Sequence, residues 1–314
     1  MVRNLNSYAD TSFEKLTQRD DRQEDILKRA STRKQLLLSF FNHKMAILGI
    51  IVLFCIIVMA IIGPMISGYE GSKQSLLEAN LAPDSKYWFG TDDLGRDVFT
   101  RIWLGARISL SIGIIAALID IVVGIVVGAI SGYAAGRGKW GDRIDGFLMR
   151  IVEILYGVPY LLVVILLLVL MKPGLVTMII ALSLTGWVSM ARIVRGQVLQ
   201  VKQQQFVTAA ELLGTSHAGI LLKHIIPNIM AVIIVNLTFT IPSAIFAESF
   251  LSFLGLGVQA PAASWGTMAN DALGVILSGE WWRLLFPSLL IALTMFSFNA
   301  IGDGLQDTLQ VEVD

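Results

Sequence analysis

The sequence is poor in charged residues and in cysteine. Only 15% of its 314 residues are Asp, Glu, Lys or Arg, and acidic and basic residues are equal in number. A chain without excess charge of either sign offers no general electrostatic attraction to nucleic acid. Its one cysteine, Cys55, lies inside an apolar run and has no second cysteine with which to pair. We therefore expect neither a nucleic-acid partner nor an internal disulfide framework.

The sequence also lacks the patterns of common catalytic and metal sites. Its three histidines, His43, His217 and His224, have neither the spacing of a metal site nor an obvious Ser or Cys nucleophile partner. No Gly-x-x-x-x-Gly-Lys-[Ser/Thr] phosphate loop occurs in the chain. We therefore predict no catalytic residues, no cofactor and no metal, and any energy derived from ATP must be supplied by another chain.

Apolar runs near 20 residues long are abundant. Hydrophobic residues make up 55% of the chain, and one such run is enough to indicate a bilayer span. A soluble protein of this size would not repeat such runs. The pattern predicts an all-α membrane protein with six transmembrane helices, at residues 45–66, 108–133, 147–171, 175–194, 229–253 and 284–304.

These spans divide the chain into five parts. The expected parts are an N-terminal arm, a first span, an outer loop, a core of five spans and a tail, at residues 1–44, 45–66, 67–107, 108–304 and 305–314. Much of 1–30 is polar enough to be disordered, whereas 33–44 alternates basic and apolar residues as an interfacial helix does.

The distribution of Lys and Arg indicates the orientation. Basic residues concentrate in the N-terminal arm and in the loops at 134–146 and 195–228. Because cytoplasmic loops carry an excess of Lys and Arg, these segments are expected inside the cell. We therefore predict a multi-pass protein of the cytoplasmic membrane, in contact with lipid and with both termini in the cytoplasm.

One stretch between two spans, residues 206–228, is too polar to cross a bilayer. Its pattern predicts a short helix over 206–213 that ends at Gly214, since glycine takes the positive-φ stop position without a Cβ clash. The Thr-Ser pair after Gly214 can cap a second helix through Lys223, which Pro227 would close before the next span. Such a helical pair is typical of a docking element; the alternative is an ordinary polar connection.

Small residues and one carboxylate share a ridge of the second span. They recur every four residues and so fall on one helical face: Ala116, Asp120, Gly124, Gly128, Gly132 and Gly136. Successive glycines let another helix approach closely, so we expect Gly124, Gly128 and Gly132, with Asp120, to lie in a helix–helix contact. A charged group at mid-span costs about 2.5 to 3.5 kcal/mol on insertion scales, so Asp120 must face protein or water. It is either a pathway residue or a protonated carboxyl that hydrogen-bonds a neighbouring helix.

Proline occurs in the middle of the third and fifth spans. Pro159 in the third span and the Pro242-Ser243 pair in the fifth interrupt the backbone hydrogen-bond ladder, and freed carbonyls are tolerated where a helix lines a cavity. These three residues are therefore candidates for lining a pathway. Glu153 and Glu248 lie near opposite ends of the same spans, where we expect them to reach water or a basic neighbour.

The polar stretch resembles a known element. Ala209-Ala210, Gly214 four residues on and Pro227 thirteen after that glycine match the coupling loop of binding-protein-dependent ABC importer permeases. In that family the loop sits in a groove of a separate ATPase subunit and transmits its motion. The family pattern has Glu before the two alanines, where this chain has Thr208. The resemblance assigns ATPase coupling to Ala209, Ala210, Glu211, Gly214, His217, Lys223 and Pro227.

Further motifs resemble the oligopeptide and dipeptide permeases of that family. They are the strings at 89–97 and 248–257 with 264–266, and those at 187–198 and 299–307 look closest to the C-type subunit of the oligopeptide type. The resemblance covers residues 33–309 and implies a type I ABC importer permease fold in a bacterial inner membrane. It implies as partners a second, related permease, two cytoplasmic ATPases and an extracytoplasmic peptide-binding protein.

The expected function is therefore that of a permease subunit for oligopeptides or dipeptides, which is not itself an enzyme. A secondary transporter or channel is the main alternative, but such proteins often show inverted repeats and charge relays. A scaffold without transport would leave the kinked spans and Asp120 without a role. An ABC permease for nickel chelates or glutathione also remains open, since the outer binding protein would set the substrate.

Overall fold

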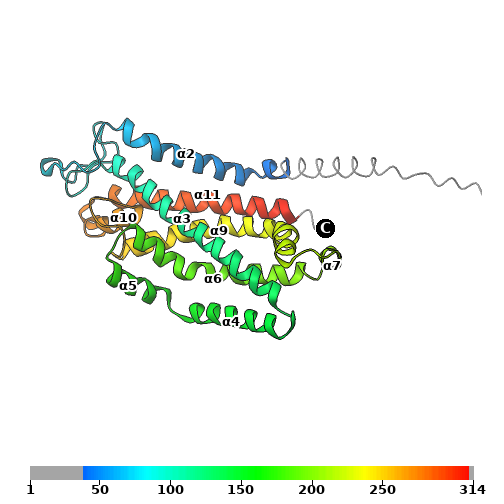
Figure 1. The fold of residues 1–314 in the computed structure, drawn as a ribbon. Coiled ribbons are helices and arrows are strands. Elements are labelled where there is room, and N and C mark those ends of the chain that lie inside the picture. Colours follow the sequence, from blue (N-terminus) through cyan, green and yellow to red (C-terminus); the bar gives the residue numbers. More distant parts are fainter. Residues whose placement is uncertain (1–37, 311–314) are drawn as a thin grey trace, which may run out of the picture.

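The computed structural model describes residues 38–310, in which helices run side by side along a common direction (Figure 1). The expected disordered arm, the first five residues of the interfacial helix at 33–44 and the end of the tail lie outside the described residues, whereas residues 38–42 of that segment are helical. The helices are α2 (Lys44–Ile66), α3 (Val98–Ala134), α4 (Gly138–Gly157), α5 (Tyr160–Met171), α6 (Leu175–Val201), α7 (Gln205–Leu212), α8 (His217–Ile220), α9 (Ile226–Phe253), α10 (Trp265–Leu273) and α11 (Trp282–Gln310).

The all-α membrane fold is confirmed. Five helices are long and apolar enough to cross a membrane, namely α2, α3, α6, α9 with the α8 segment before it, and α11. The helices α4 and α5 pass the same test only as a pair. We call the end of the bundle where α3 and α6 terminate the α7 end, and the opposite end, where α2 and α9 terminate, the α10 end (Figure 1).

The third span, predicted over 147–171, is not one continuous helix. It is broken between α4 and α5, which are bent by 86° relative to each other. Val158 is extended, with ψ 126°, and Pro159 precedes the first residue of α5. Proline has no N–H for the helical ladder and disfavours helical geometry in the residue before it. Pro159 therefore ends one helix and starts another.

The second span begins earlier than predicted. The outer loop, expected to reach residue 107, ends at Asp97, and α3 starts at Val98. The Asp97 carboxylate caps the helix by accepting from the Thr100 N–H at 2.7 Å. The predicted span left these turns out because their arginines lower the hydropathy. Yet one face of the segment, including Val98 and Ile102, is buried in the core.

Helix α3 joins the two largest hydrophobic clusters. At the α10 end, α2, α3, α10 and α11 pack around Trp265, which is fully buried and whose indole N–H donates to the Ile102 carbonyl at 2.9 Å. At the α7 end, α3 and α6 pack with α7, α8 and the start of α9. Helix α3 therefore connects the clusters at the two ends of the bundle.

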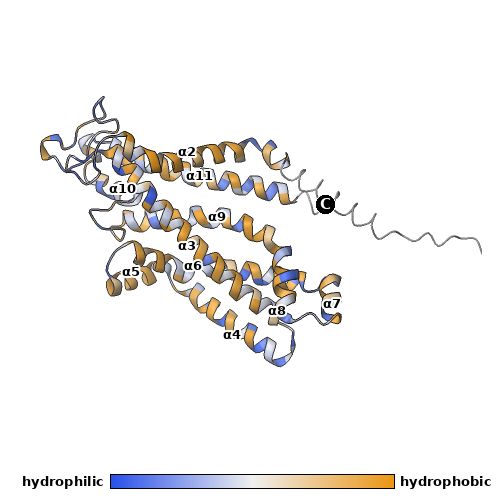
Figure 2. Ribbon diagram, turned by 45° about the horizontal axis from the view of Figure 1, so that its top comes forward, coloured by the Kyte–Doolittle hydropathy of each residue, from blue (hydrophilic) through white to orange (hydrophobic). Residues whose placement is uncertain are grey.

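The outer surface of the bundle suits a lipid environment. Apolar residues predominate along the middle of the helices, and polar residues concentrate at both ends (Figure 2). Phe54 of α2 and Val169 of α5 are among many large apolar side chains that remain exposed. A soluble protein would not expose a continuous apolar belt of this kind. The chain is a multi-pass membrane protein.

Candidate functional site

The loop at the α7 end has the backbone that the sequence predicts up to its second helix. Helix α7 ends at Leu212, and Gly214 follows with φ +77°, so the expected positive-φ stop is confirmed. Ser216 then caps α8, its hydroxyl accepting from the Gly219 N–H at 3.2 Å. We call residues 205–225 the α7–α8 loop. Two short helices thus fold back on each other around one glycine.

The second helix does not stop at Pro227, contrary to the prediction. Helix α8 passes through a π-helical turn, Leu221–Ile225, directly into α9. In that turn the Ile226 N–H donates to the Leu221 carbonyl, five residues back. Pro227 falls in the first turn of α9, where its missing N–H is tolerated. The α7–α8 loop is therefore continuous with a membrane span.

The α7–α8 loop has one buried face and one exposed face. Its buried face, which includes Val207, Ala210 and Ile220, packs in the same cluster as the ends of α3 and α6. Its exposed face carries Leu212, Leu213 and Leu222, whose side chains are 85%, 86% and 64% exposed. Exposed apolar groups that lie together usually mark an interaction site.

The seven residues that the resemblance assigned to ATPase coupling differ in burial. Ala210 belongs to the buried face, while the other six are exposed: Ala209, Glu211, Gly214, His217, Lys223 and Pro227. Two of the six contact the corner between α3 and α4. Glu211 forms an ion pair with Arg137, and His217 Nδ1 lies 3.0 Å from the Tyr133 hydroxyl. Arg137 and Tyr133 were not predicted, because they are 74 and 84 residues away from these partners in sequence.

The glycines of the small-residue ridge pack α3 against α6 of the same chain. A Cβ added at Gly124 would lie 2.6 Å from the Met190 Cβ, and one at Gly132 would lie 2.8 Å from the Arg195 carbonyl oxygen. At Gly128 it would overlap the backbone of α6. Gly136 does not belong to this contact, because α3 has already ended and open space surrounds it.

Asp120 faces the protein interior rather than lipid. It is 4% exposed and packs directly against Gly186 of α6, where a side chain would overlap its carboxyl group. Its Oδ1 has no hydrogen-bond partner among the described residues, and the same holds for the buried Tyr160 hydroxyl and the Ser183 hydroxyl. The structure thus places Asp120 in the contact between α3 and α6.

The proline positions differ in their surroundings. Pro242 is buried within α9 without ending it, and the exposed Ser243 hydroxyl donates to the Phe239 carbonyl at 2.8 Å. Pro159 is exposed at the break before α5. Residues next to both prolines, Tyr160 and Ile241, pack in one cluster with α3. The spans that contain these two prolines therefore meet around α3.

Glu248 does not reach water or a basic neighbour as predicted. It is fully buried, and its carboxylate accepts from the Ser109 hydroxyl at 2.9 Å and the Ser252 hydroxyl at 2.7 Å. The Ser109 hydroxyl oxygen also accepts from the backbone N–H of Trp265 at 3.2 Å. A buried carboxyl is tolerated when it is hydrogen-bonded. These hydroxyls join α3, α9 and α10, and sequence alone does not bring them together.

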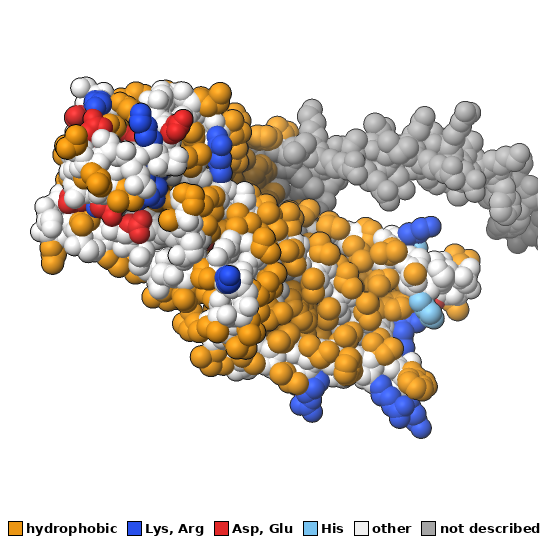
Figure 3. Space-filling model, turned by 60° about the vertical axis from the view of Figure 1, so that its left-hand side comes forward, with side chains coloured by type: hydrophobic (Ala, Val, Ile, Leu, Met, Phe, Trp, Pro, Cys, Tyr) orange, Lys and Arg blue, Asp and Glu red, His pale blue; other side chains and the backbone are white. Residues whose placement is uncertain are grey.

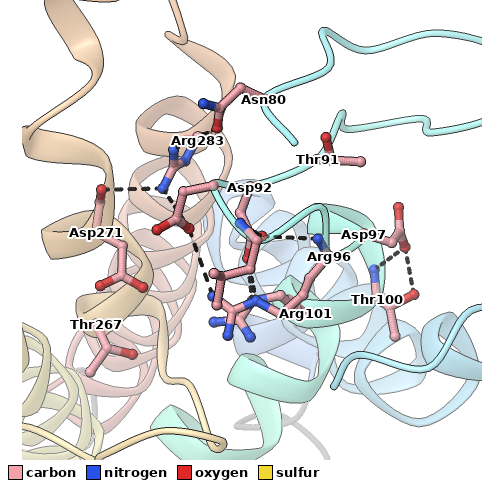
Figure 4. Close-up of polar contacts among 12 residues, drawn as sticks. Asn80, Thr91, Asp92, Arg96, Asp97, Thr100, Arg101, Thr267, Asp271 and Arg283 are labelled. Carbon is pink, nitrogen blue, oxygen red and sulfur yellow. Dashed lines mark hydrogen bonds and ion pairs between the residues drawn. The ribbon is translucent and has the colours of Figure 1, made fainter. Parts of the chain in front are cut away.

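A network of charged residues closes the α10 end (Figure 4). The Asp92 carboxylate contacts Arg96 Nε at 2.7 Å and Arg101 Nε at 3.2 Å, and all three side chains are buried. Arg283 of α11 donates to the Asp271 carbonyl at 3.3 Å. Burial raises the pKa of the Asp271 carboxyl, and the charge of Arg101 opposes that shift. The network fastens the outer loop to α3, α10 and α11.

Comparison with known proteins identifies the family. Residues 124–313 match the family described as binding-protein-dependent transport system inner membrane component. The chain belongs to this family of permeases. Residues 31–83 of the permease match a second family, the N-terminal TM domain of oligopeptide transport permease C. The resemblance seen in the sequence motifs is thereby confirmed.

Individual relatives cover nearly the whole permease. It is 55% identical to the dipeptide transport system permease protein DppC of Bacillus subtilis (strain 168), over 94% of this chain and 91% of that protein. It is 51% identical to the oligopeptide transport system permease protein OppC of the same organism, over 91% and 92%. The glutathione transport system permease protein GsiD of Escherichia coli O6:K15:H31 is 38% identical over 87% and 88%.

A solved structure supports the fold. A chain of the MetNI methionine ABC transporter, in an inward-facing conformation, matches with a TM-score of 0.51 at 19% identity. The match covers 65% of the permease and 96% of that chain. The permease therefore has the fold of an ABC importer permease.

Proposed function

We propose that this chain is the permease subunit of an ATP-driven importer of short peptides, and that its α7–α8 loop is the docking surface for an ATPase subunit. The exposed leucines of that loop carry the docking proposal. The sequence has no phosphate loop of its own, so the energy of ATP has to come from another chain. Relatives named as dipeptide and oligopeptide permeases, at 55% and 51% identity, support the substrate class. ATP hydrolysis is then the task of partner subunits.

The proposed orientation puts the α7 end in the cytoplasm, with both chain termini. In the face shown in Figure 3, acidic and basic side chains gather at the α10 end, whereas the other end carries mainly Lys, Arg and His. An excess of basic residues is typical of the cytoplasmic side. The arm at 1–44 and the tail at 305–314 then lie inside, and the loop at 67–97 lies outside.

The proposed assembly contains more chains than this one. A single permease provides half of a pathway, so we infer a second, related permease beside it, two cytoplasmic ATPases and an extracytoplasmic peptide-binding protein. Family membership argues for these partners and against a secondary transporter. Pro159, Pro242 and Ser243 remain our candidates for lining the pathway, because they lie on spans that meet around α3.

Glutathione is the second candidate substrate. The relative named as a glutathione transport permease is 38% identical, which is lower than the identity to the peptide permeases. Glutathione is itself a tripeptide, so both candidates require a pathway for small, charged peptides. Competition of labelled trialanine uptake by unlabelled glutathione would separate the two: strong competition would favour glutathione.

The docking surface is tested by placing charge on it. Leu212→Glu combined with Leu213→Glu should release the ATPase that docks on this chain and abolish uptake, because both side chains are almost fully exposed and no packing within the chain holds them. Burying two carboxylates in an apolar groove would cost several kcal/mol. The measurement is the amount of ATPase that copurifies with the tagged permease after expression of the complete set of subunits.

Leu277→Glu provides the matched control. Leu277 is 99% exposed but lies at the α10 end, between α10 and α11. That variant should retain its ATPases. If the double variant at 212 and 213 also retains them at normal yield, the loop is not the docking surface.

A further inference from the structure

The corner between α3 and α4 contacts both helices of the α7–α8 loop through one side chain. Arg137 precedes the first residue of α4, and its Nη2 forms an ion pair with Glu211 of α7. Its Nη1 lies 3.5 Å from Nδ1 of His217, the first residue of α8. The guanidinium also lies over the Tyr133 ring, 4.0 Å from its centre, in the last turn of α3.

These contacts use the particular shape of arginine. Its planar guanidinium carries several N–H donors in a fixed fork and stacks on aromatic faces. One group can therefore contact a carboxylate, an imidazole and a phenol ring at the same time. The single ammonium of lysine has no plane to stack and no second nitrogen. His217 Nδ1 also lies 3.0 Å from the Tyr133 hydroxyl, so the four side chains form one connected group.

The same corner is anchored to the membrane helices. Lys202, just after α6, donates to the Gly132 carbonyl at 2.9 Å and also to the Ala135 carbonyl. Arg195 of α6 forms a bidentate pair with Asp145 of α4, both contacts being 2.7 Å. Bidentate pairs hold orientation as well as distance. The end of α3 is thus joined to α4 and α6 on one side and to the α7–α8 loop on the other.

We propose that Arg137 is a positioning residue that transmits movement of the α7–α8 loop to α3. The inference rests on the proposed function, in which an ATPase moves that loop. A displaced α7 would pull Glu211, and a displaced α8 would pull His217. Arg137 joins both to the corner, from which α3 runs through the glycine contact with α6 to the α10 end. Without Arg137 the loop keeps its apolar packing and the contact between His217 and Tyr133, but α7 loses the ion pair that joins Glu211 to the corner.

The test uses the complete importer in proteoliposomes, with the binding protein and labelled trialanine as substrate. ATP hydrolysis and trialanine uptake are measured in the same sample. Arg137→Ala should leave the amount of bound ATPase unchanged and lower the trialanine imported per ATP hydrolysed at least about fivefold, the low end of coupling between sites. A merely structural role would change yield or stability and leave this ratio unaltered.

Charge exchange tests the contact itself. Arg137→Glu and Glu211→Arg should each lower the ratio, because each places like charges together. The two changes combined should restore part of it by rebuilding the ion pair in reverse. Arg143→Ala is the matched control: Arg143 lies on α4 near the same corner, over the Trp140 ring rather than against the α7–α8 loop. Its ratio should stay normal.

The outcomes separate this inference from the docking proposal. A normal uptake ratio in Arg137→Ala, or no recovery in the charge exchange, would overturn the role of Arg137 and leave ATPase docking untouched. Release of the ATPases by Arg137→Ala would also overturn it, since Arg137 would then support docking rather than transmission. Failure of the docking proposal is visible separately, as ATPases that stay bound to the variant with both loop leucines replaced.

Discussion

Gly128→Leu should abolish peptide uptake by forcing α3 and α6 apart. A Cβ at this position would overlap the Ala191 carbonyl oxygen and lie 2.8 Å from the Val194 Cβ. The first of these atoms belongs to the backbone and cannot move without the helix. Overpacking a well-packed core costs typically about 1 to 3 kcal/mol, and leucine adds three further carbons to that Cβ. The measurements are yield, thermal stability and uptake.

The control for this change lies on the opposing helix. Gly196 of α6 is exposed, and a side chain there would enter open space, since no atom lies within 4 Å of an added Cβ. Gly196→Leu should therefore be tolerated, and Gly128→Ala should fall between the two. Native yield and native uptake in Gly128→Leu would show that α3 and α6 are not held together at this glycine.

Gly186→Val should be about as damaging, and for a different reason. The three atoms nearest to a Cβ at Gly186 all belong to the Asp120 carboxyl group. That group is buried, so a valine would have to displace it into close-packed helices. Because the conflict involves a single side chain, Asp120→Ala in the same chain should restore assembly and thermal stability. The pair should be strongly non-additive, as expected of residues in direct contact.

A substitution of Asp120 alone tests the role of this residue. Asp120→Asn keeps the shape of the side chain and removes its ability to titrate. If Asp120 serves packing, uptake by this variant should stay near normal across the pH range, because partner ATPases supply the energy. Loss of uptake in an intact complex would instead make Asp120 a pathway residue. Failure of Asp120→Ala to rescue Gly186→Val would show that the contact between them is not what limits assembly.

Local signals in the sequence predicted the framework of the permease. Apolar runs indicated its spans because a bilayer core requires a fixed length of helix. Gly214 was predicted to take positive φ because the stop of a helix depends on a few neighbouring residues. The ridge containing Gly124, Gly128 and Gly132 was predicted to pack closely because helical spacing puts these residues on one face. Each of these inferences depends only on residues close together in the chain.

The tertiary structure decided which partners these elements have. The ridge itself did not identify α6 as its partner, and nothing near Asp120 in sequence points to Gly186. Glu248 meets the Ser109 hydroxyl across 139 residues, and Glu211 meets Arg137 across 74. A periodic pattern specifies which face of a helix carries apolar or small residues, but many helices could pack against that face. Only the packing of the whole bundle selects one, and with it the contacts that join the α7–α8 loop to α3.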